Sequence, residues 1–156
     1  MTESVTARIT CGRFSMGPPV QQFQVGNGIT YLIHPDHRNG AATKSQWTIP
    51  ELDERQVFES SLLSNWTDVL QGAGWGLHLV AGRPSNLGVT ADRLLAVFVA
   101  KFVGGGGNQE WHGYPADPRR GGRDRPSVEV LGMWLRANVL TPAKISKIAK
   151  GRPCSL

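Results

Sequence analysis

Histidine is the side chain of this sequence best suited to proton transfer, because its ordinary pKa lies close to neutral pH. The chain has four histidines, and His34 and His37 lie three positions apart in a stretch rich in Pro, Asp, Asn and Gly. His112 lies far along the chain, in the sequence Trp-His-Gly-Tyr-Pro. If the fold brings His37 and His112 together, we expect them to act as acid and base in the hydrolysis of a phosphodiester or an amide. Otherwise they are surface histidines without a chemical role.

The spacing of His34, Asp36 and His37 also suggests a site for a divalent metal ion, because imidazole and carboxylate groups are common metal ligands. This signal is unspecific, since a short loop does not fix the ligand geometry and the spacing matches no established metal motif. We therefore expect no metal, and we keep this loop as the candidate site should one bind.

Positive charge is concentrated at the end of a chain whose formal net charge is +5. Residues 119–156 contain nine basic and two acidic side chains, whereas residues 1–118 contain eight basic and ten acidic ones. Clustered Lys and Arg side chains are typical of surfaces that bind the phosphates of nucleic acids. A solvated basic face that keeps the protein soluble is the alternative. The candidate phosphate-binding residues are Arg119, Arg120, Arg123, Arg125, Lys144, Lys147 and Lys150.

Two aromatic residues flank His112 directly after a run of four glycines at 104–107. Trp111 and Tyr114 could stack on the bases of a nucleic acid, because every base presents a flat aromatic face. Alternatively, they anchor an irregular loop to the core, with their polar edges bonded to the backbone. The two interpretations are compatible, since a binding loop has to be held in place.

Missing motifs exclude several enzyme classes. The glycine run at 104–107 is not followed by the Lys-Ser or Lys-Thr pair of a phosphate-binding loop, and neither a dinucleotide fingerprint nor a Gly-x-Ser-x-Gly elbow occurs. Cys11 and Cys154 are too few and too distant for a disulfide framework or a zinc finger. We therefore expect no cofactor. No apolar run approaches the ~20 residues that span a bilayer, and no signal peptide is recognisable, so we expect a soluble, cytoplasmic protein.

Five segments have the alternating or β-branched pattern of strands. The clearest are 20–25 and 29–34, which flank Gly-Asn-Gly and should form a hairpin that ends in a loop at 34–40. Residues 94–103 are apolar on both faces and predict a central strand, with a helix capped by Thr90 as the alternative. The remaining expected strands are 5–10 and 75–81, and 45–49 is a further candidate for a short strand.

A long amphipathic helix is expected after Thr48 and Glu51, which have the spacing of a capping box. Apolar residues then recur at three- and four-residue steps as far as Leu70, and glycines at 72 and 74 favour a stop. The outer face of this helix should be acidic and should avoid nucleic acid. The residues assigned to that face are Glu51, Asp53, Glu54, Glu59 and Asp68.

Two short helices are expected in the basic segment. Ser127 is a suitable cap for the first, and Thr141 followed by Pro142 is the preferred start of the second, which Gly151 should end. Ile145, Ile148 and Ala149 should face Trp134, with lysines pointing outward. The sequence thus predicts one α+β domain over residues 1–156. It would contain a mostly antiparallel sheet of about five strands, one long amphipathic helix and a C-terminal basic helical hairpin.

Three functions are compatible with these features. The first is a small nucleic-acid-binding protein, or one that binds another phosphate-bearing ligand, in which the basic segment contacts phosphates. The second is a small hydrolase or nuclease that uses His112 and His37 as acid and base. The third is a protein-interaction module of the inhibitor or immunity type, for which we expect neither a pocket nor clustered histidines.

Overall fold

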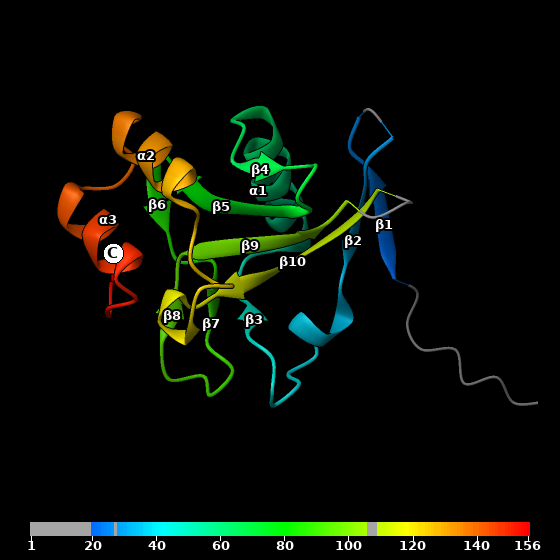
Figure 1. The fold of residues 1–156 in the computed structure, drawn as a ribbon. Coiled ribbons are helices and arrows are strands. Elements are labelled where there is room, and N and C mark those ends of the chain that lie inside the picture. The colour runs from blue at the N-terminus through cyan, green and yellow to red at the C-terminus, as the bar shows by residue number, and fades with distance from the viewer. Residues whose placement is uncertain (1–19, 27, 106–108) are drawn as a thin grey trace, which may run out of the picture.

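The computed structural model describes residues 20–26, 28–105 and 109–156, which form a single α+β fold (Figure 1). The strand expected at 5–10 lies outside the described residues. The strands are β1 (Gln21–Gln24), β2 (Thr30–Ile33), β3 (Gln46–Trp47), β4 (Thr67–Asp68), β5 (Ala73–Val80), β6 (Arg83–Ser85), β7 (Gly88–Val89), β8 (Ala96–Val97), β9 (Val99–Gly104) and β10 (Glu110–Ala116). The helices are α1 (Glu51–Leu63), α2 (Val128–Arg136) and α3 (Pro142–Ala149), with short 3-10 helices η1 (Pro35–His37) and η2 (Pro118–Arg120).

The main sheet has seven strands in the order β1-β2-β10-β9-β5-β4, with β6 paired to β5, and a second sheet contains β3, β7 and β8. Among the strand pairs of the described residues only β2 and β10 run parallel, so the expectation of a mostly antiparallel sheet is confirmed. The expected number of about five strands was too low, because β4 and β6 are very short and β10 was read as a loop. The strand expected at 94–103 is divided between β8 and β9, and the helix considered there is wrong.

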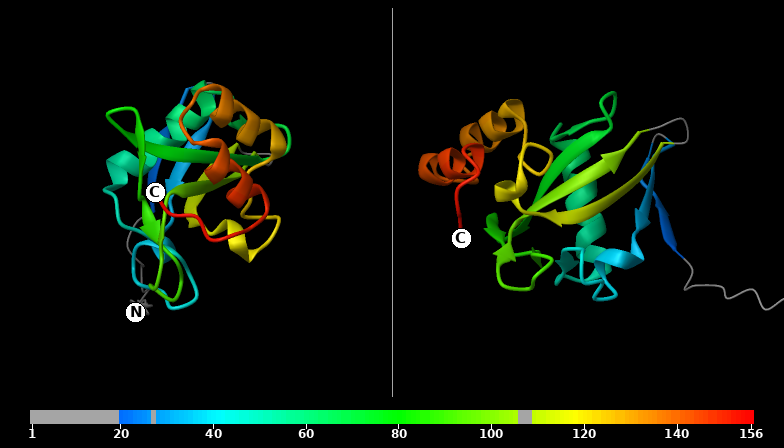
Figure 2. Two further views of the ribbon diagram at one scale, coloured as in Figure 1. Left: turned by 90° about the vertical axis from the view of Figure 1, so that its left-hand side faces the viewer. Right: turned by 60° about the horizontal axis from the view of Figure 1, so that its bottom comes forward.

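The main sheet buries side chains on both faces, because successive residues of a strand point in opposite directions. Ala100 and Phe102 of β9 belong to one apolar cluster with Phe58 of α1. Val99 of the same strand belongs to a second cluster with Trp134 of α2. In the right-hand view of Figure 2, α1 crosses behind the strands, and α2 and α3 lie together at one end of the sheet.

Close packing of α1 on the sheet depends on Gly76 in β5. A Cβ atom at this position would lie 2.8 Å from the side chain of Val57 and 2.9 Å from the ring of Phe102, closer than packed carbon atoms approach. Trp75 and Leu77 point to the other face and pack in the cluster beneath α2. The glycines of β5 therefore mark the face that α1 covers.

α1 begins and ends at positions other than those predicted. It starts at Glu51 after Pro50, and no side chain caps it, so the assignment of Thr48 as the cap is wrong. It ends at Leu63, several residues before the expected end, because the chain turns at Asn65, which has a φ of +58°, and enters β4. The apolar residues after this turn belong to the sheet and its loops.

The faces of α1 also differ from the expected pattern. Glu54 was assigned to the solvent-exposed face but is fully buried, whereas Leu52 is exposed. The helix is oriented by Val57 and Phe58, which pack against the sheet and turn the preceding Glu54 toward β2. Counting apolar residues gave the wrong orientation because the charged Glu54 and the polar Ser61 also occupy the buried side.

α2 and α3 begin where the caps predicted. The Ser127 hydroxyl accepts a hydrogen bond from the Val130 amide at 3.2 Å, and the Thr141 hydroxyl accepts one from the Lys144 amide at 3.3 Å. Trp134 packs in one cluster with Ile145 and Ile148, as expected, but Ala149 is exposed. No helix in the described part of the chain is long and apolar enough to cross a membrane.

Candidate functional site

The loop that contains η1 and the strand β10 bring three of the four histidines together. β2 and β10 are parallel and pair Leu32 with His112, and η1 follows directly after β2. The ring centroid of His34 lies 5.8 Å from that of His37 and 5.5 Å from that of His112. His34 therefore lies near both of the other rings, and His37 and His112 line the same cleft.

The His37 ring is held by a hydrogen bond and by stacking. Its Nδ1 lies 2.8 Å from the carbonyl oxygen of Ser45, and its ring stacks on Tyr114 with centroids 5.4 Å apart and planes 18° apart. A carbonyl only accepts, so Nδ1 donates this bond and Nε2 keeps a lone pair in the neutral ring. Burial lowers the pKa of His37 despite the bond to Ser45, and the charges of His34 and Lys44 lower it further.

His112 is half-buried on β10 and has a similar electrostatic environment. Burial lowers its pKa, and the nearby His34 and Lys44 lower it further. A lowered pKa favours the neutral ring, which has one lone pair available for a proton. An anion bound beside both rings would oppose this effect and favour their charged forms.

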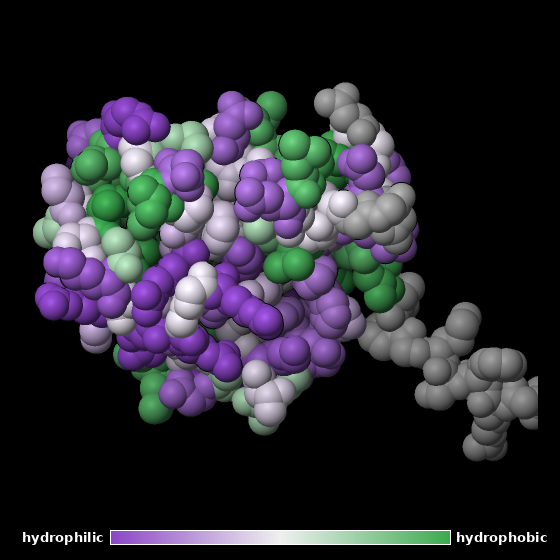
Figure 3. Space-filling model, viewed as in Figure 1, coloured by the Kyte–Doolittle hydropathy of each residue, from purple (hydrophilic) through white to green (hydrophobic). Residues whose placement is uncertain are grey.

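His37 and His112 open into one cleft with a volume of about 460 Å³. Lys44, Arg120 and Arg123 bring positive charge to this cleft from two separate loops. Figure 3 shows hydrophilic residues gathered on the face of the molecule between α3 and η1. The cleft is lined by His37, Thr43, Lys44, Ser45, Thr90, Ala91, His112, Tyr114, Pro115, Asp117, Arg120, Arg123 and Asp124.

Asp117 shapes the turn that presents the arginines. Its carboxylate accepts a hydrogen bond from the Arg119 amide at 3.1 Å, which caps η2, and it forms an ion pair with the Arg119 guanidinium at 2.7 Å. Asp117 lies in the cleft wall, and burial opposes the effect of Arg119, which on balance lowers the pKa of this carboxyl. Arg120 and Arg123 follow this turn and are exposed in the cleft. In this turn Arg119 is paired with Asp117, whereas Arg120 and Arg123 can contact a ligand in the cleft.

Asp124 connects this turn to the histidines. It accepts hydrogen bonds from the Tyr114 hydroxyl at 3.0 Å and from the Asp117 amide at 3.4 Å. Burial and the charge of Asp124 raise the pKa of Tyr114 well above its ordinary value, so the phenol stays protonated and keeps donating this bond. Tyr114 in turn packs on His37. The position of the arginine turn and that of His37 are therefore coupled.

A buried ion pair holds the η1 loop on α1. The guanidinium of Arg38, which follows His37, binds the carboxylate of Glu54 and donates to the Ile49 carbonyl at 2.9 Å. Tyr31 donates a hydrogen bond to the same carboxylate at 2.8 Å. Burial raises the pKa of Glu54 to about 6, although Arg38 and Tyr31 act in the opposite direction.

Trp111 is not available for base stacking. Its side chain is fully buried, and its ring centroid lies 5.7 Å from that of Phe58 in α1. Strand alternation explains this, because Trp111 points to the face of β10 that α1 covers while His112 and Tyr114 point to the other. Trp111 is therefore buried in the core, as in the anchor interpretation, but its indole nitrogen has no hydrogen-bond partner among the described residues. A buried ring is not placed to stack on a base of a nucleic acid.

The other predicted basic residues do not line the cleft. Arg125 donates to the Pro118 carbonyl at 3.0 Å and packs on Gly151, so it joins the turn to the end of α3. Lys147 borders a separate cavity described below. The remaining two lysines, at positions 144 and 150, belong to α3 and its C-cap and contribute to neither cavity.

The metal-site candidate in the η1 loop is wrong. The His34 Nδ1 accepts a hydrogen bond from the Asp36 amide at 3.3 Å, which caps η1, and the His37 Nδ1 bonds to Ser45. Over residues 20–26, 28–105 and 109–156, no three His, Cys, Asp or Glu side chains are grouped so as to hold a metal ion.

Sequence reasoning missed Lys44 and Asp124 as members of the cleft. Lys44 lies two residues before the two-residue strand β3, and Asp124 lies between Arg123 and Arg125, where basic residues dominate the sequence. The spacing of His112 and Tyr114, two positions apart in β10, was the available signal that both side chains point to one face.

The chain matches no model of a known protein family, and no curated protein or solved structure matches it.

Proposed function

We propose that the protein binds nucleic acid in this cleft and cleaves a phosphodiester bond, with His37 and His112 as the acid–base pair. The observation that carries the proposal is the presence of both histidines in one cleft with Arg120 and Arg123. A phosphodiester needs positive charge for its oxygens, a base for the attacking hydroxyl and an acid for the leaving oxygen. The residues of the cleft can supply all three.

His37 is the general base in this proposal. Its Nδ1–H is engaged by the Ser45 carbonyl, so Nε2 is the nitrogen that can take a proton. The hydroxyl of a water molecule or of an adjacent ribose loses this proton and attacks phosphorus. The oxygen–phosphorus bond to the leaving nucleoside breaks, and His112 in its protonated form gives its proton to the departing oxygen. The roles of base and acid fall to two separate elements, because His37 belongs to η1 and His112 to β10.

Arg120 and Arg123 bind the non-bridging oxygens. A guanidinium offers parallel N–H donors that match a phosphate, and the charge that grows on these oxygens in the transition state strengthens the contact. Lys44 adds a third positive charge from another loop that lines the cleft. Tyr114 acts as a positioning residue, because it holds the His37 ring and is itself held by Asp124.

Binding without cleavage is the second candidate, and the concentration of basic residues in 119–156 favours it. It uses the same arginines and gives the histidines only a binding role. The third candidate, a protein-interaction module, was expected to have neither a pocket nor clustered histidines, and this chain has both.

Cleavage and binding of labelled single-stranded and duplex DNA and RNA at two salt concentrations test the proposal. His37→Gln and His112→Gln should abolish turnover while binding survives, and Arg120→Gln with Arg123→Gln should weaken binding. His78→Gln is the matched control, because His78 lies in β5 and outside the residues that line the cleft. Turnover that persists in both cleft histidine variants would refute acid–base cleavage. An absence of binding at low salt would refute the nucleic-acid ligand itself.

A further inference from the structure

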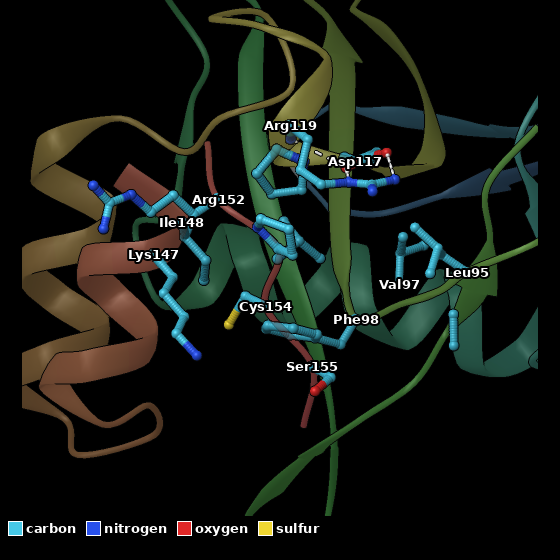
Figure 4. A pocket seen from close by; sticks show the side chains of 15 residues that line it. Leu95, Val97, Phe98, Asp117, Arg119, Lys147, Ile148, Arg152, Cys154 and Ser155 are labelled. Atoms are coloured by element: carbon cyan, nitrogen blue, oxygen red, sulfur yellow. Dashed lines mark hydrogen bonds and ion pairs between the residues drawn. The ribbon is translucent and has the colours of Figure 1, made fainter. Parts of the chain in front are cut away.

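A second cavity, with a volume of about 310 Å³, lies between the β8–β9 segment and the chain that follows α3 (Figure 4). Apolar side chains line much of it, among them Val97, Phe98 and Ile148. Cys154 of the C-terminal segment lies beside Phe98 in this view. The volume is at the lower end of the range of about 300–1,000 Å³ that is usual for small-molecule sites. It suits a flat group the size of one nucleobase.

Two positive charges border this cavity. Figure 4 shows Lys147 of α3 and Arg152 of the C-terminal segment on the same side of it, with the Arg152 guanidinium at the outer end of its side chain, directed away from Phe98. Neither belongs to the ion pairs found among the described residues. Arg119 lies on another side, where it is paired with Asp117. An apolar cavity with unneutralised cations at its edge fits a ligand with an apolar ring and a nearby anion.

The turn at η2 is the wall between this cavity and the cleft of the histidines. Asp117 lines both of them. The consecutive residues Arg119 and Arg120 border different ones, the first the cavity and the second the cleft. A ligand that crosses this turn would therefore meet positive charge on both sides. The phosphate backbone of a polynucleotide has charges along its whole length and could make this crossing.

We propose that the second cavity is a base subsite for the strand whose phosphate lies in the cleft, so that the preferred ligand is a single-stranded polynucleotide. This inference rests on the function proposed above and names its substrate class. One base enters beside Phe98, and the phosphate next to it meets Lys147 and Arg152. The backbone continues across η2 to Arg120.

The requirement for a single strand follows from the shape of the cavity. A base that enters a cavity has to leave its stack and its pairing partner, which costs a few kcal/mol in a duplex and little in a single strand. Apolar contacts in the cavity, to Phe98 among other side chains, compensate for part of this cost without selecting a sequence. A duplex should therefore bind through phosphate contacts alone and more weakly.

Oligonucleotide binding by the double variant Lys147→Gln/Arg152→Gln tests this subsite, with a second double variant as the matched control. Fluorescence anisotropy would be measured in the His112→Gln background, where cleavage is not expected, with a single-stranded octanucleotide, a hairpin duplex and a dinucleotide. The variant should bind the octanucleotide about tenfold more weakly and the dinucleotide unchanged, and its log–log salt slope should fall by about 0.7 for the one single-strand phosphate that both cations contact. Arg136→Gln/Lys150→Gln removes the same charge from exposed positions outside both cavities and should change neither value beyond a general salt effect.

The Cys154 thiol allows a second test that needs no substitution at the subsite. The thiol lies in the cavity, and burial raises its pKa, so its alkylation by iodoacetamide should be slow but measurable at alkaline pH. The octanucleotide should protect it, and the dinucleotide should not. Mass spectrometry of peptides separates this thiol from that of Cys11.

The outcomes distinguish this inference from the function on which it rests. If no oligonucleotide binds or is cleaved, the proposed function fails and the subsite with it. Equal binding of the dinucleotide and the octanucleotide would refute only the subsite. The same holds if Lys147→Gln/Arg152→Gln and Arg136→Gln/Lys150→Gln bind the octanucleotide equally and the octanucleotide does not protect Cys154. Tight, length-dependent binding of the single strand with protection of Cys154 supports it.

Discussion

Glu54 joins α1 to the loop that carries His37, and its replacement by glutamine has a predictable effect on stability. The carboxylate is fully buried, and its pKa in the folded protein is about 6, compared with an ordinary value of 4.5. The folded state therefore holds a proton more tightly than the unfolded state does. Between these two pH values the free energy of unfolding should fall as pH rises, and the full difference is worth about 2 kcal/mol.

Denaturant unfolding of the native protein and of Glu54→Gln between pH 4 and 8 measures this contribution. The glutamine side chain does not titrate, so the difference between the two free energies of unfolding isolates the carboxyl group. This difference should decline by about 2 kcal/mol from pH 4.5 to above pH 6 and then stay constant. Glu59→Gln is the control, because Glu59 pairs with Arg55 at the surface of the same helix and should give an almost flat difference.

A flat difference for Glu54→Gln would contradict this argument, and so would one that rises with pH. A rise would mean that the hydrogen bonds from Arg38 and Tyr31 outweigh the cost of burial and lower the pKa of Glu54. Because Arg38 follows His37 directly, the same variant should also loosen the cleft. Its loss of turnover should exceed that of Glu59→Gln.

Two further predictions concern the cleft and the fold. Burial lowers the pKa values of both His37 and His112, so both limbs of the bell-shaped dependence of kcat/KM on pH should lie below about 6.5, and a maximum at alkaline pH would contradict the assigned roles. Gly76→Ala should lower the free energy of unfolding by about 1–3 kcal/mol, because its Cβ would overlap side chains of α1 and β9. Gly122→Ala, with no atom within 4 Å of the added carbon, should change it by less than about 0.5 kcal/mol in the same denaturation assay.

Elements specified by neighbouring residues were predictable from the sequence. The hairpin of β1 and β2 was expected from the sequence Gly-Asn-Gly between them, and the starts of α2 and α3 follow from Ser127 and Thr141. Each signal acts within a few residues, so no knowledge of the rest of the fold was needed.

Elements and contacts that depend on distant residues were not predictable in the same way. The meeting of His34 with His112 arises from the parallel pairing of β2 and β10, which no local pattern specifies. The burial of Glu54 depends on Arg38 and Tyr31. In each case, tertiary contacts outweighed the local pattern.

The central claim is that an anionic phosphodiester binds beside His37 and His112. Histidine ring resonances, followed by NMR over pH with and without a dinucleotide bound to the full chain, test it most directly. A bound phosphate favours the charged imidazolium, so the titrations of both cleft histidines should move to higher pH when the dinucleotide is present. The resonances of His78 should be the same with and without the dinucleotide. Unchanged titrations of His37 and His112 at saturating dinucleotide, or equal changes at His78, would contradict the claim.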